Sequence, residues 1–511
     1  MIYYSNMKNV DNQKAIGLFI KKLREKRFLT QGELAERLGT TQSAVARMEK
    51  GGQNITAGEL LKIGDALEHR IVSLSDSIDF KITGGKPLRG SIKTNPSKNG
   101  AMGLLCASLL NKNTTILHGI PRIEEVNRML EIFTALDVKY KWLENQTLEI
   151  NPPKKFNKKG LLHPSVANVR SSLMLLPAMS HFFKDFALLH TGGCKMGERT
   201  ISAHRYALQD MGISIKTENN KYHISRTDLK SGEIVMYEAS DTATENAIMM
   251  AALIPGVTKI SFAPPNYQVQ EVCFFLEKCG VKIEGVGTTT LVVHGVTEIN
   301  NKIEYHNSED PIESMMFLAA AITTHSKLKI ERCPIDFLAL ELTKLKIMGL
   351  KYNLSKSYLA LNGQTKLVDI TVFPSKLKAL KDKIHAQPYP GINSDNLPFF
   401  VPIATQAEGT TLIHDWMWEN RAIYFTELNR LGANITLVDP HRAFVNGPTS
   451  LKAAQVVCPP ALRPAVIILI AMLAAPGVSI LRNVYSITRG YEDVVERLNS
   501  IGANIEKIIS I

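Results

Sequence analysis

Six copies of one short phrase divide most of this chain, and they constrain its fold more than any other feature. Each copy has a central turn residue, followed by the alternating apolar residues that are typical of a strand. Successive central residues are 75, 68, 69, 83 and 70 positions apart, at Asp137, Gly212, Gly280, Gly349, Gly432 and Gly502. Spacing this regular predicts a structural repeat of roughly 70 residues.

Each repeat contains both helical and strand patterns. An apolar helix, such as "AVIILIAMLA" at residues 465–474, precedes a short strand. An amphipathic helix, such as Glu492 to Leu498, then ends at the turn residue, as a C-capping glycine would end it. In each repeat, the helix that precedes the short strand is apolar on nearly all sides. We therefore expect these helices in the interior of each domain and the sheets on its outer side. The predicted fold class is α/β, with two inside-out domains of three repeats each.

The first 75 residues follow a different pattern. Thr30 to Glu33 and Thr56 to Glu59 are capping boxes that begin amphipathic helices. Gly39 ends one helix and Gln42 to Glu49 forms the next, which predicts a helix-turn-helix. Residues 1–72 contain 12 Lys and Arg against 8 Asp and Glu, a net charge of +4. A small helical bundle for protein contact is the alternative interpretation.

The phrase "LTQGELAERLGTTQSAVARMEKG" closely resembles the Cro/repressor-like (XRE) helix-turn-helix family. The resemblance implies a DNA-binding domain over residues 13–75, with Gln42, Ser43 and Arg47 at base edges and Gln31 at phosphate. Such domains usually dimerise on palindromic sites, so the resemblance leaves an oligomer open.

Composition excludes several other classes of protein. Charged residues make up 21% and apolar residues 45%, which argues against bulk disorder. The apolar run Ala465 to Ala475 is too short to span a membrane, and the polar start of the chain argues against secretion. Six cysteines without metal-ligand spacing predict neither a disulfide framework nor a zinc site, and the expected location is the cytoplasm. The net charge of +12 favours polyanionic partners, either nucleic acid or phosphorylated small molecules.

Three local motifs in the repeats are candidate functional sites, and two of them point to a bound anion. Lys98 opens an apolar helix, where its charge is unfavourable unless an anion lies nearby. Arg463 likewise leads into a very apolar helix and needs an anionic partner. Cys194 lies in a glycine-rich loop beside Lys195, which suits an exposed cysteine with thiolate character.

The repeat and these motifs resemble the enolpyruvyl transferase family over residues 82–511. Within it, the cysteine loop matches the branch that uses UDP-N-acetylglucosamine, not the shikimate-pathway branch. The resemblance implies one domain of residues 98–308 and a second of residues 82–97 plus 309–511. It implies transfer of the enolpyruvyl group of phosphoenolpyruvate to the sugar 3-hydroxyl, with no metal ion or organic cofactor.

The resemblance also assigns roles to individual residues. Cys194 would protonate the enol carbon, Asp395 would take the hydroxyl proton, and Lys98 and Arg463 would surround the phosphate. For Arg170 and Arg421, salt bridges within the protein are an equal alternative to ligand contact. The substrate-binding residues it implies are Lys98, Asn99, Arg170, Arg199, Thr200, Ile201, Ser202, Ala203, Ser240, Asp395, Met417, Arg421 and Arg463.

The departures from the family pattern gather on the nucleotide side. Ser202 replaces the aspartate that contacts uracil, and Glu238 and Asp241 stand in the loop that binds diphosphate. Carboxylates near a diphosphate repel it by about 1 kcal/mol when solvated and by more in a dry site. Three hypotheses therefore stay open: transfer to UDP-N-acetylglucosamine, transfer to another nucleotide such as uridine monophosphate, and a ligand-sensing transcription regulator without turnover.

Overall fold

The described residues of the computed structural model are 12–27, 29–53, 55–67, 78–192 and 200–509. The chain divides into two units, Met1–Ile78 with Ile509–Ile511 and Asp79–Ile508. Each unit is described by itself. Among the described residues, no helix is both long enough and apolar enough to cross a membrane.

The described residues of the first unit form four helices, α1 (Asn12–Lys26), α2 (Gln31–Leu38), α3 (Gln42–Glu49) and α4 (Ala57–Ala66), and the last three are the helices expected from the sequence. The capping box at Thr30 is formed as expected, because the side chains of Thr30 and Glu33 each accept a bond from the other residue's backbone. Gly39 ends α2 at a φ of 62°, a left-handed conformation that suits glycine. The buried apolar core comprises Ile20, Leu34, Ala35, Ala44, Val45, Met48, Ile63 and Leu67.

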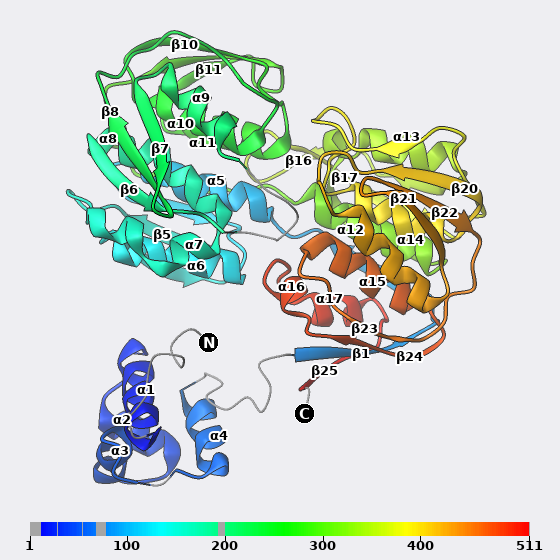
Figure 1. Cartoon of the computed structure of the whole chain (residues 1–511), viewed down its shortest axis with the longest axis horizontal. Helices are drawn as coiled ribbons and strands as arrows, with labels where there is room; N and C mark the ends of the chain where they lie inside the picture. The colour runs from blue at the N-terminus through cyan, green and yellow to red at the C-terminus, as the bar shows by residue number, and fades with distance from the viewer. Residues whose placement is uncertain (1–11, 28, 54, 68–77, 193–199, 510–511) are drawn as a thin grey trace. The chain divides into compact units, whose positions relative to one another are not determined.

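Six sheets form the second unit among the described residues, as the sixfold repeat predicts (Figure 1). Three come from the middle of the chain. The first has the order β13 (Ile303–His306), β3 (Thr115–His118), β5 (Thr147–Asn151), β4 (Lys139–Glu144). The second has the order β6 (Asp185–Leu189), β8 (Lys221–Arg226), β7 (Ile213–Glu218). The third has the order β11 (Lys282–Glu284), β12 (Thr290–Gly295), β10 (Gly256–Ser261), β9 (Glu233–Val235).

The other three sheets come from the C-terminal part of the unit, and two of them also include a strand from its start. One has the order β15 (Lys351–Leu354), β17 (Lys366–Phe373), β14 (Lys327–Pro334), β2 (Arg89–Lys93), with β16 (Tyr358–Leu359) beside β17. Another has the order β18 (Leu377–Lys378), β20 (Ala407–His414), β22 (Arg442–Gly447), β21 (Asn434–Asp439), with β19 (Ile384–His385) beside β20. The last has the order β23 (Gln455–Val457), β24 (Gly477–Arg482), β1 (Ile78–Gly84), β25 (Ile505–Ile509).

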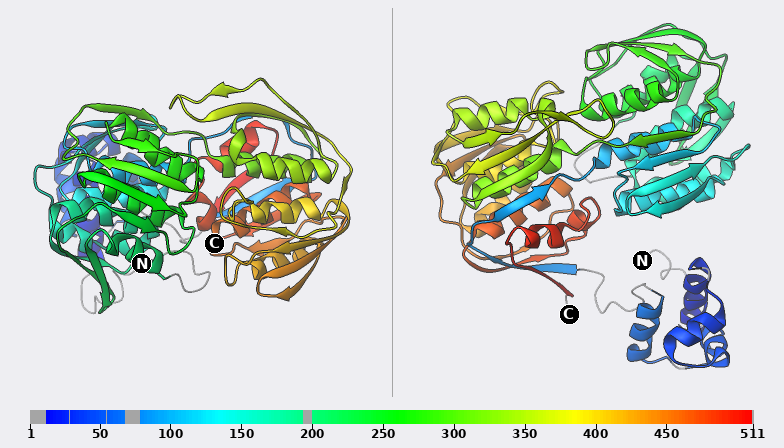
Figure 2. Two further views of the ribbon diagram at one scale, coloured as in Figure 1. Left: turned by 90° about the horizontal axis from the view of Figure 1, so that it is seen from above. Right: turned by 180° about the vertical axis from the view of Figure 1, so that it is seen from behind.

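The apolar helices lie inside these sheets, as their composition predicts (Figure 2). In α12 (Pro311–Thr323) every residue is buried, and in α15 (Leu462–Ala474) the burial runs from Arg463 to Leu473. The other α-helices are α5 (Lys98–Ser108), α6 (Glu124–Ala135), α7 (Pro164–Asn168), α8 (Leu175–Phe182), α9 (Ser202–Gln209), α10 (Asp241–Ala252), α11 (Tyr267–Lys278), α13 (Ala339–Ile347), α14 (Phe400–Ala404), α16 (Tyr485–Thr488) and α17 (Val494–Ser500). The 3₁₀ segments are η1 (Lys158–Leu162), η2 (Arg170–Met174), η3 (Ile335–Phe337), η4 (Leu397–Phe399) and η5 (Ala422–Leu431).

The six turn residues of the repeat all adopt the left-handed conformation. Their φ angles are 65°, 94°, 98°, 103°, 86° and 96°, at Asp137, Gly212, Gly280, Gly349, Gly432 and Gly502. Two details differ from the sequence-based expectation. The helix expected at Glu492 begins at Val494, because Asp493 has a positive φ of 46°, and the segment before Gly432 is the 3₁₀ helix η5.

The three sheets from the middle of the chain form one set, and the other three form a second set. The chain passes twice between these two sets of sheets, at residues 94–97 and 307–310. Strand β2 pairs with β14 in one set, whereas β13 pairs with β3 in the other. The two passages lie side by side, since the Ser97 amide donates to Ser308 O at 2.7 Å and the Asp310 amide to Asn95 O at 2.8 Å. The expected boundary between residues 97 and 98 is at the end of the first passage, and the boundary between residues 308 and 309 is within the second. The division into two domains stays a prediction.

Candidate active site and helix-turn-helix surface

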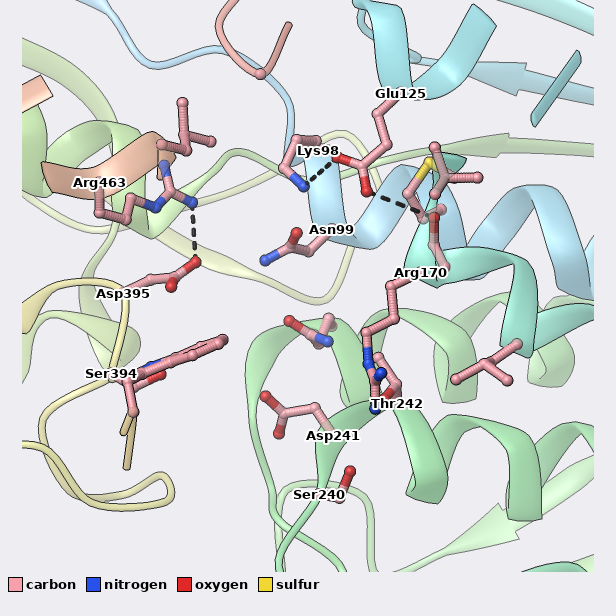
Figure 3. A pocket seen from close by; sticks show the side chains of 18 of the residues that line it. Lys98, Asn99, Glu125, Arg170, Ser240, Asp241, Thr242, Ser394, Asp395 and Arg463 are labelled. Atoms are coloured by element: carbon pink, nitrogen blue, oxygen red, sulfur yellow. Dashed lines mark hydrogen bonds and ion pairs between the residues drawn. The ribbon is translucent and has the colours of Figure 1, made fainter. Parts of the chain in front are cut away.

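A pocket of about 1090 Å³ lies in the second unit where α5, α10 and α15 begin. Lys98, Asp241 and Arg463 line it from the first two residues of these helices. Figure 3 shows their side chains around one central space, with Asp395 beside Arg463. A helix N-terminus carries partial positive charge, so three of them favour an anionic ligand.

The Lys98 ammonium has an anionic partner within the protein. Its Nζ donates to Glu125 Oε2 at 2.7 Å, and Glu125 is near the start of α6. Burial is the largest single effect and raises the pKa of Glu125, but the charge and hydrogen bond of Lys98, with smaller contributions from Arg489 and Ser171, together bring the pKa below its ordinary value. The anion that Lys98 was expected to need is therefore, in this structure, the ionised Glu125.

Asp395 lies between two arginines at the pocket. Arg463 donates to its Oδ2 at 3.0 Å, and Arg421 comes within 3.8 Å of its Oδ1. Burial raises the pKa of Asp395, but the charges of Arg463 and Arg421 outweigh that effect and hold it below the ordinary value of 3.8. Asp395 is therefore a carboxylate near neutral pH.

Arg421 is itself almost fully buried and supports the loop that carries Asp395. Its guanidinium donates to both carboxylate oxygens of Asp415, at 2.6 and 2.8 Å, and to Ser394 O at 2.6 Å. Of the two roles that the sequence left open for Arg421, this geometry favours a salt bridge that positions Asp395.

The remaining predicted site residues divide into three groups. Arg170 lines the pocket and donates to Thr200 O at 2.8 Å. Ile201 and Ser202 do not line the pocket. Cys194 and Arg199 lie outside the described residues. The other predicted residues that line the pocket are Asn99, Thr200, Ala203, Ser240 and Met417.

The start of α10 brings a carboxylate to the wall opposite Asp395 (Figure 3). Asp241 is its first residue and accepts a hydrogen bond from Asn266 Nδ2 at 2.8 Å. Burial, with a smaller contribution from the Asp395 charge, raises the pKa of Asp241 to about 6 despite that bond. Glu238 also lines this side of the pocket.

Three further residues shape the pocket and were not singled out from the sequence. The first is Glu125, the partner of Lys98. The second is Tyr267, whose hydroxyl accepts a hydrogen bond from Asn99 Nδ2 at 2.8 Å. The third is His204, whose Nδ1 lies 2.9 Å from the Asn246 Nδ2 donor and therefore accepts a hydrogen bond. In a neutral imidazole the proton is then on Nε2, which lies 3.3 Å from Thr242 Oγ1. Each partner is distant in sequence, and no local motif could have identified these contacts.

In the first unit, the residues expected to contact DNA lie on or beside one helix face. Gln42, Ser43 and Arg47 are exposed on α3. Gln42 Nε2 donates to Gln31 Oε1 at 2.7 Å, and Gln31 Nε2 donates to Glu49 Oε2 at 2.8 Å. Arg24 pairs with Glu49 from α1 at 2.6 Å, so a buried ion pair fixes the base of this network.

Two family models match the chain. The model described as EPSP synthase (3-phosphoshikimate 1-carboxyvinyltransferase) matches residues 82–498. The chain belongs to this family of enolpyruvyl transferases. The model described as helix-turn-helix matches residues 20–68, which confirms the motif seen in the sequence.

Curated relatives match this enolpyruvyl transferase over nearly their whole length. The UDP-N-acetylglucosamine 1-carboxyvinyltransferase of Treponema denticola is 37% identical over 429 residues, which cover 84% of this chain and 99% of the relative. The protein of the same name from Helicobacter pylori is 31% identical over 434 residues, with the same coverage of 84% and 99%.

Solved structures show the same fold. The enolpyruvyl transferase NikO from Streptomyces tendae aligns with a TM-score of 0.73 at 23% identity, covering 85% of this chain and 100% of NikO. EPSP synthase from Acinetobacter baumannii aligns with a TM-score of 0.66 at 18% identity, covering 84% of this chain and 99% of that one.

The pocket of this enolpyruvyl transferase combines two chemical capacities. Lys98 and Arg463 present fixed positive charge at helix N-termini, which can bind a small, highly charged anion. Asp395 presents an ionised carboxylate in the same pocket, which can accept a proton from an alcohol.

Proposed function

We propose that the chain transfers the enolpyruvyl group of phosphoenolpyruvate to the 3-hydroxyl of UDP-N-acetylglucosamine, and releases phosphate. The observation that carries this proposal is the ionised Asp395, which lies in one pocket with Lys98 and Arg463. The names and near-complete coverage of the relatives from Treponema denticola and Helicobacter pylori support the choice of acceptor.

The proposed reaction is an addition followed by an elimination. The acceptor oxygen bonds to C2 of phosphoenolpyruvate, its proton passes to Asp395, and Cys194 supplies a proton to C3. The tetrahedral intermediate then loses a proton from C3, and the bond from C2 to the phosphate oxygen breaks. Phosphate leaves, and the C2–C3 double bond is restored. Lys98 and Arg463 stabilise charge on the phosphate and carboxylate, and no step requires a redox partner.

Uridine monophosphate, or a similar nucleotide, is the second candidate acceptor. The carboxylates of Asp241 and Glu238 line the side of the pocket where α10 begins. A carboxylate at a helix N-terminus competes with a bound phosphate for the same positive end. An acceptor with a single phosphate group would not need a diphosphate-binding loop there.

The acceptor is tested by phosphate release from phosphoenolpyruvate with each acceptor in parallel, and with Cys194→Ser as the inactive control. Release with UDP-N-acetylglucosamine that the variant abolishes supports the primary proposal. Release with uridine monophosphate alone supports the second candidate. If neither acceptor gives release while phosphoenolpyruvate still binds, as calorimetry can measure, both are wrong, and a different acceptor or a ligand-sensing regulator remains.

We also propose that residues 13–75 bind DNA through α3. The helix-turn-helix presents Gln42, Ser43 and Arg47 to solvent, and the network from Gln31 to Arg24 holds α3 on α1. Glutamine and arginine are side chains that commonly pair with adenine and guanine edges in the major groove.

DNA binding is tested by selecting bound fragments from random duplexes with the full-length protein. Arg47→Ala should weaken binding to the selected site by about 1–3 kcal/mol, or roughly 5- to 150-fold. Lys62→Ala removes one exposed positive charge from α4 and serves as the matched control. Equal losses in the two variants would indicate nonspecific attraction rather than recognition by α3.

A further inference from the structure

Two histidines face each other across the ends of neighbouring strands, away from the residues that line the pocket. His118 ends β3 and His306 ends β13, and they are direct partners in the parallel pairing of these strands. Their rings stack with centroids 4.2 Å apart and planes 13° apart. Side chains of paired residues point to the same face of a sheet, which explains this close approach.

A carboxylate completes the cluster. Glu304 is two residues before His306 on β13, so it points to the same face of the sheet. Its Oε1 is 2.8 Å from His118 Nε2. One potential ligand atom from each of the three residues lies within 4.8 Å of the other two.

We infer that His118, Glu304 and His306 bind a divalent transition-metal ion such as Zn²⁺. Two imidazoles and one carboxylate are a donor set that Zn²⁺ accepts, at about 2.0–2.2 Å from each ligand atom. The Glu304 side chain is 64% exposed and can move the short distance needed to bring three ligands onto one ion. Thr147 Oγ1 is 3.2 Å from His118 Nδ1 and orients that ring through its second nitrogen.

A metal here would lie beside one of the two passages between the sets of sheets. Asn307 follows His306 directly, and its Nδ2 donates to Ser97 O and Gly119 O, both at 2.8 Å. Ser97 caps α5, whose first residue is Lys98. The ion would therefore tie β3 to β13 at the point where the chain leaves this set of sheets, and would stiffen the support of Lys98.

The site is tested by Co²⁺ titration of the full-length protein after treatment with a chelator. Visible absorption reports the coordination of the ion, and competition with Zn²⁺ gives the affinity. We expect the double variant His118→Ala/His306→Ala to bind one ion fewer per chain than the native protein. Equal binding by the two proteins would overturn the inference.

A matched control separates this site from ordinary surface pairs. His294 lies 3.0 Å from Glu284 and forms a similar pair on β12 and β11, without a second histidine in the cluster. His294→Ala should leave the titration unchanged, and a loss equal to that of the double variant would also overturn the inference.

If the double variant does not fold, Glu304→Gln replaces it, with an expected loss of at least about tenfold in affinity. Unchanged affinity in Glu304→Gln would count against the site.

Discussion

At the scale of single residues, the pocket holds two carboxylates in opposite electrostatic states. Arg463 and Arg421 keep the pKa of Asp395 low, whereas burial raises the pKa of Asp241 to about 6. They face one another across the space where the substrates are proposed to bind (Figure 3). An ionised carboxylate and a carboxyl with a pKa of about 6 therefore occupy one pocket.

Replacing Asp395 by asparagine should abolish most turnover. The amide keeps the shape of the side chain but cannot take the hydroxyl proton, so we expect kcat to fall by about 10²- to 10⁴-fold. Steady-state phosphate release measures the change. Asp439→Asn removes a surface carboxylate paired with Arg442 and should leave kcat unchanged. Near-native turnover in Asp395→Asn would show that this carboxylate is not the base.

Replacing Asp241 by asparagine should stabilise the protein in a pH-dependent way. The pKa rises from an ordinary 3.8 to about 6 on folding, so the folded state prefers the protonated form. The native protein then loses stability as pH rises from about 4 to 6, by at most about 3 kcal/mol. Melting temperatures should coincide below pH 4 and diverge above it, with the variant more stable. A constant difference across pH 4–8 would contradict the assignment.

At the scale of elements, glycines at strand ends allow sheets to pack against the C-termini of buried helices. A Cβ at Gly295, the last residue of β12, would lie 1.9 Å from Ile254 O, just after α10. Gly84 on β1 and Gly447 on β22 make the same kind of approach, at 2.1 Å from Met472 O in α15 and 2.6 Å from Ala404 O at the end of α14. The repeat therefore preserves a packing contact as well as a turn.

Gly295→Ala should destabilise the protein, because the added methyl group meets backbone rather than a flexible side chain. We expect a loss of about 1–3 kcal/mol, seen as a lower melting temperature. Gly232→Ala is the matched control, since a Cβ there meets nothing within 4 Å. Similar melting temperatures for the two variants would mean that the sheet can shift to accommodate the methyl group.

At the scale of the whole second unit, Glu492 connects the two sets of sheets beside the pocket. It accepts hydrogen bonds from the Arg122 amide at 3.1 Å and from Gln146 Nε2 at 2.5 Å. Both partners belong to the set of sheets from the middle of the chain, whereas Glu492 belongs to the other set. Because the pocket has walls from both sets, we expect this contact to affect substrate binding.

Glu492→Ala should weaken that contact and lower kcat/KM. Hydrogen bonds to a charged group contribute about 1.5–3 kcal/mol, so the loss should be roughly tenfold or more. Hydrogen exchange at the Arg122 amide should increase in parallel. Glu496→Ala, which removes a surface pair with Lys507, should change neither quantity. A fall in kcat/KM without faster exchange would point to a different cause.

Much of the fold was predictable because the signals were local. The turn residues from Asp137 to Gly502, the Thr30 capping box and the buried helices depend on residues within one or two turns of each other. The positions of Lys98, Asp395 and Arg463 in one pocket came from family resemblance, since no local rule joins segments hundreds of residues apart. Glu125 gave no signal, because an acidic residue at the start of an amphipathic helix is ordinary.

By itself, the sequence determined the repeat, the element types, the helix-turn-helix and which helices are buried, because periodicity and capping act over short distances. The tertiary structure alone decided which charges meet. Lys98 pairs with Glu125 across 27 residues, Arg463 with Asp395 across 68, and His118 with His306 through strand pairing. Such pairs depend on how whole sheets and helices pack, and side-chain chemistry along the chain does not specify that arrangement.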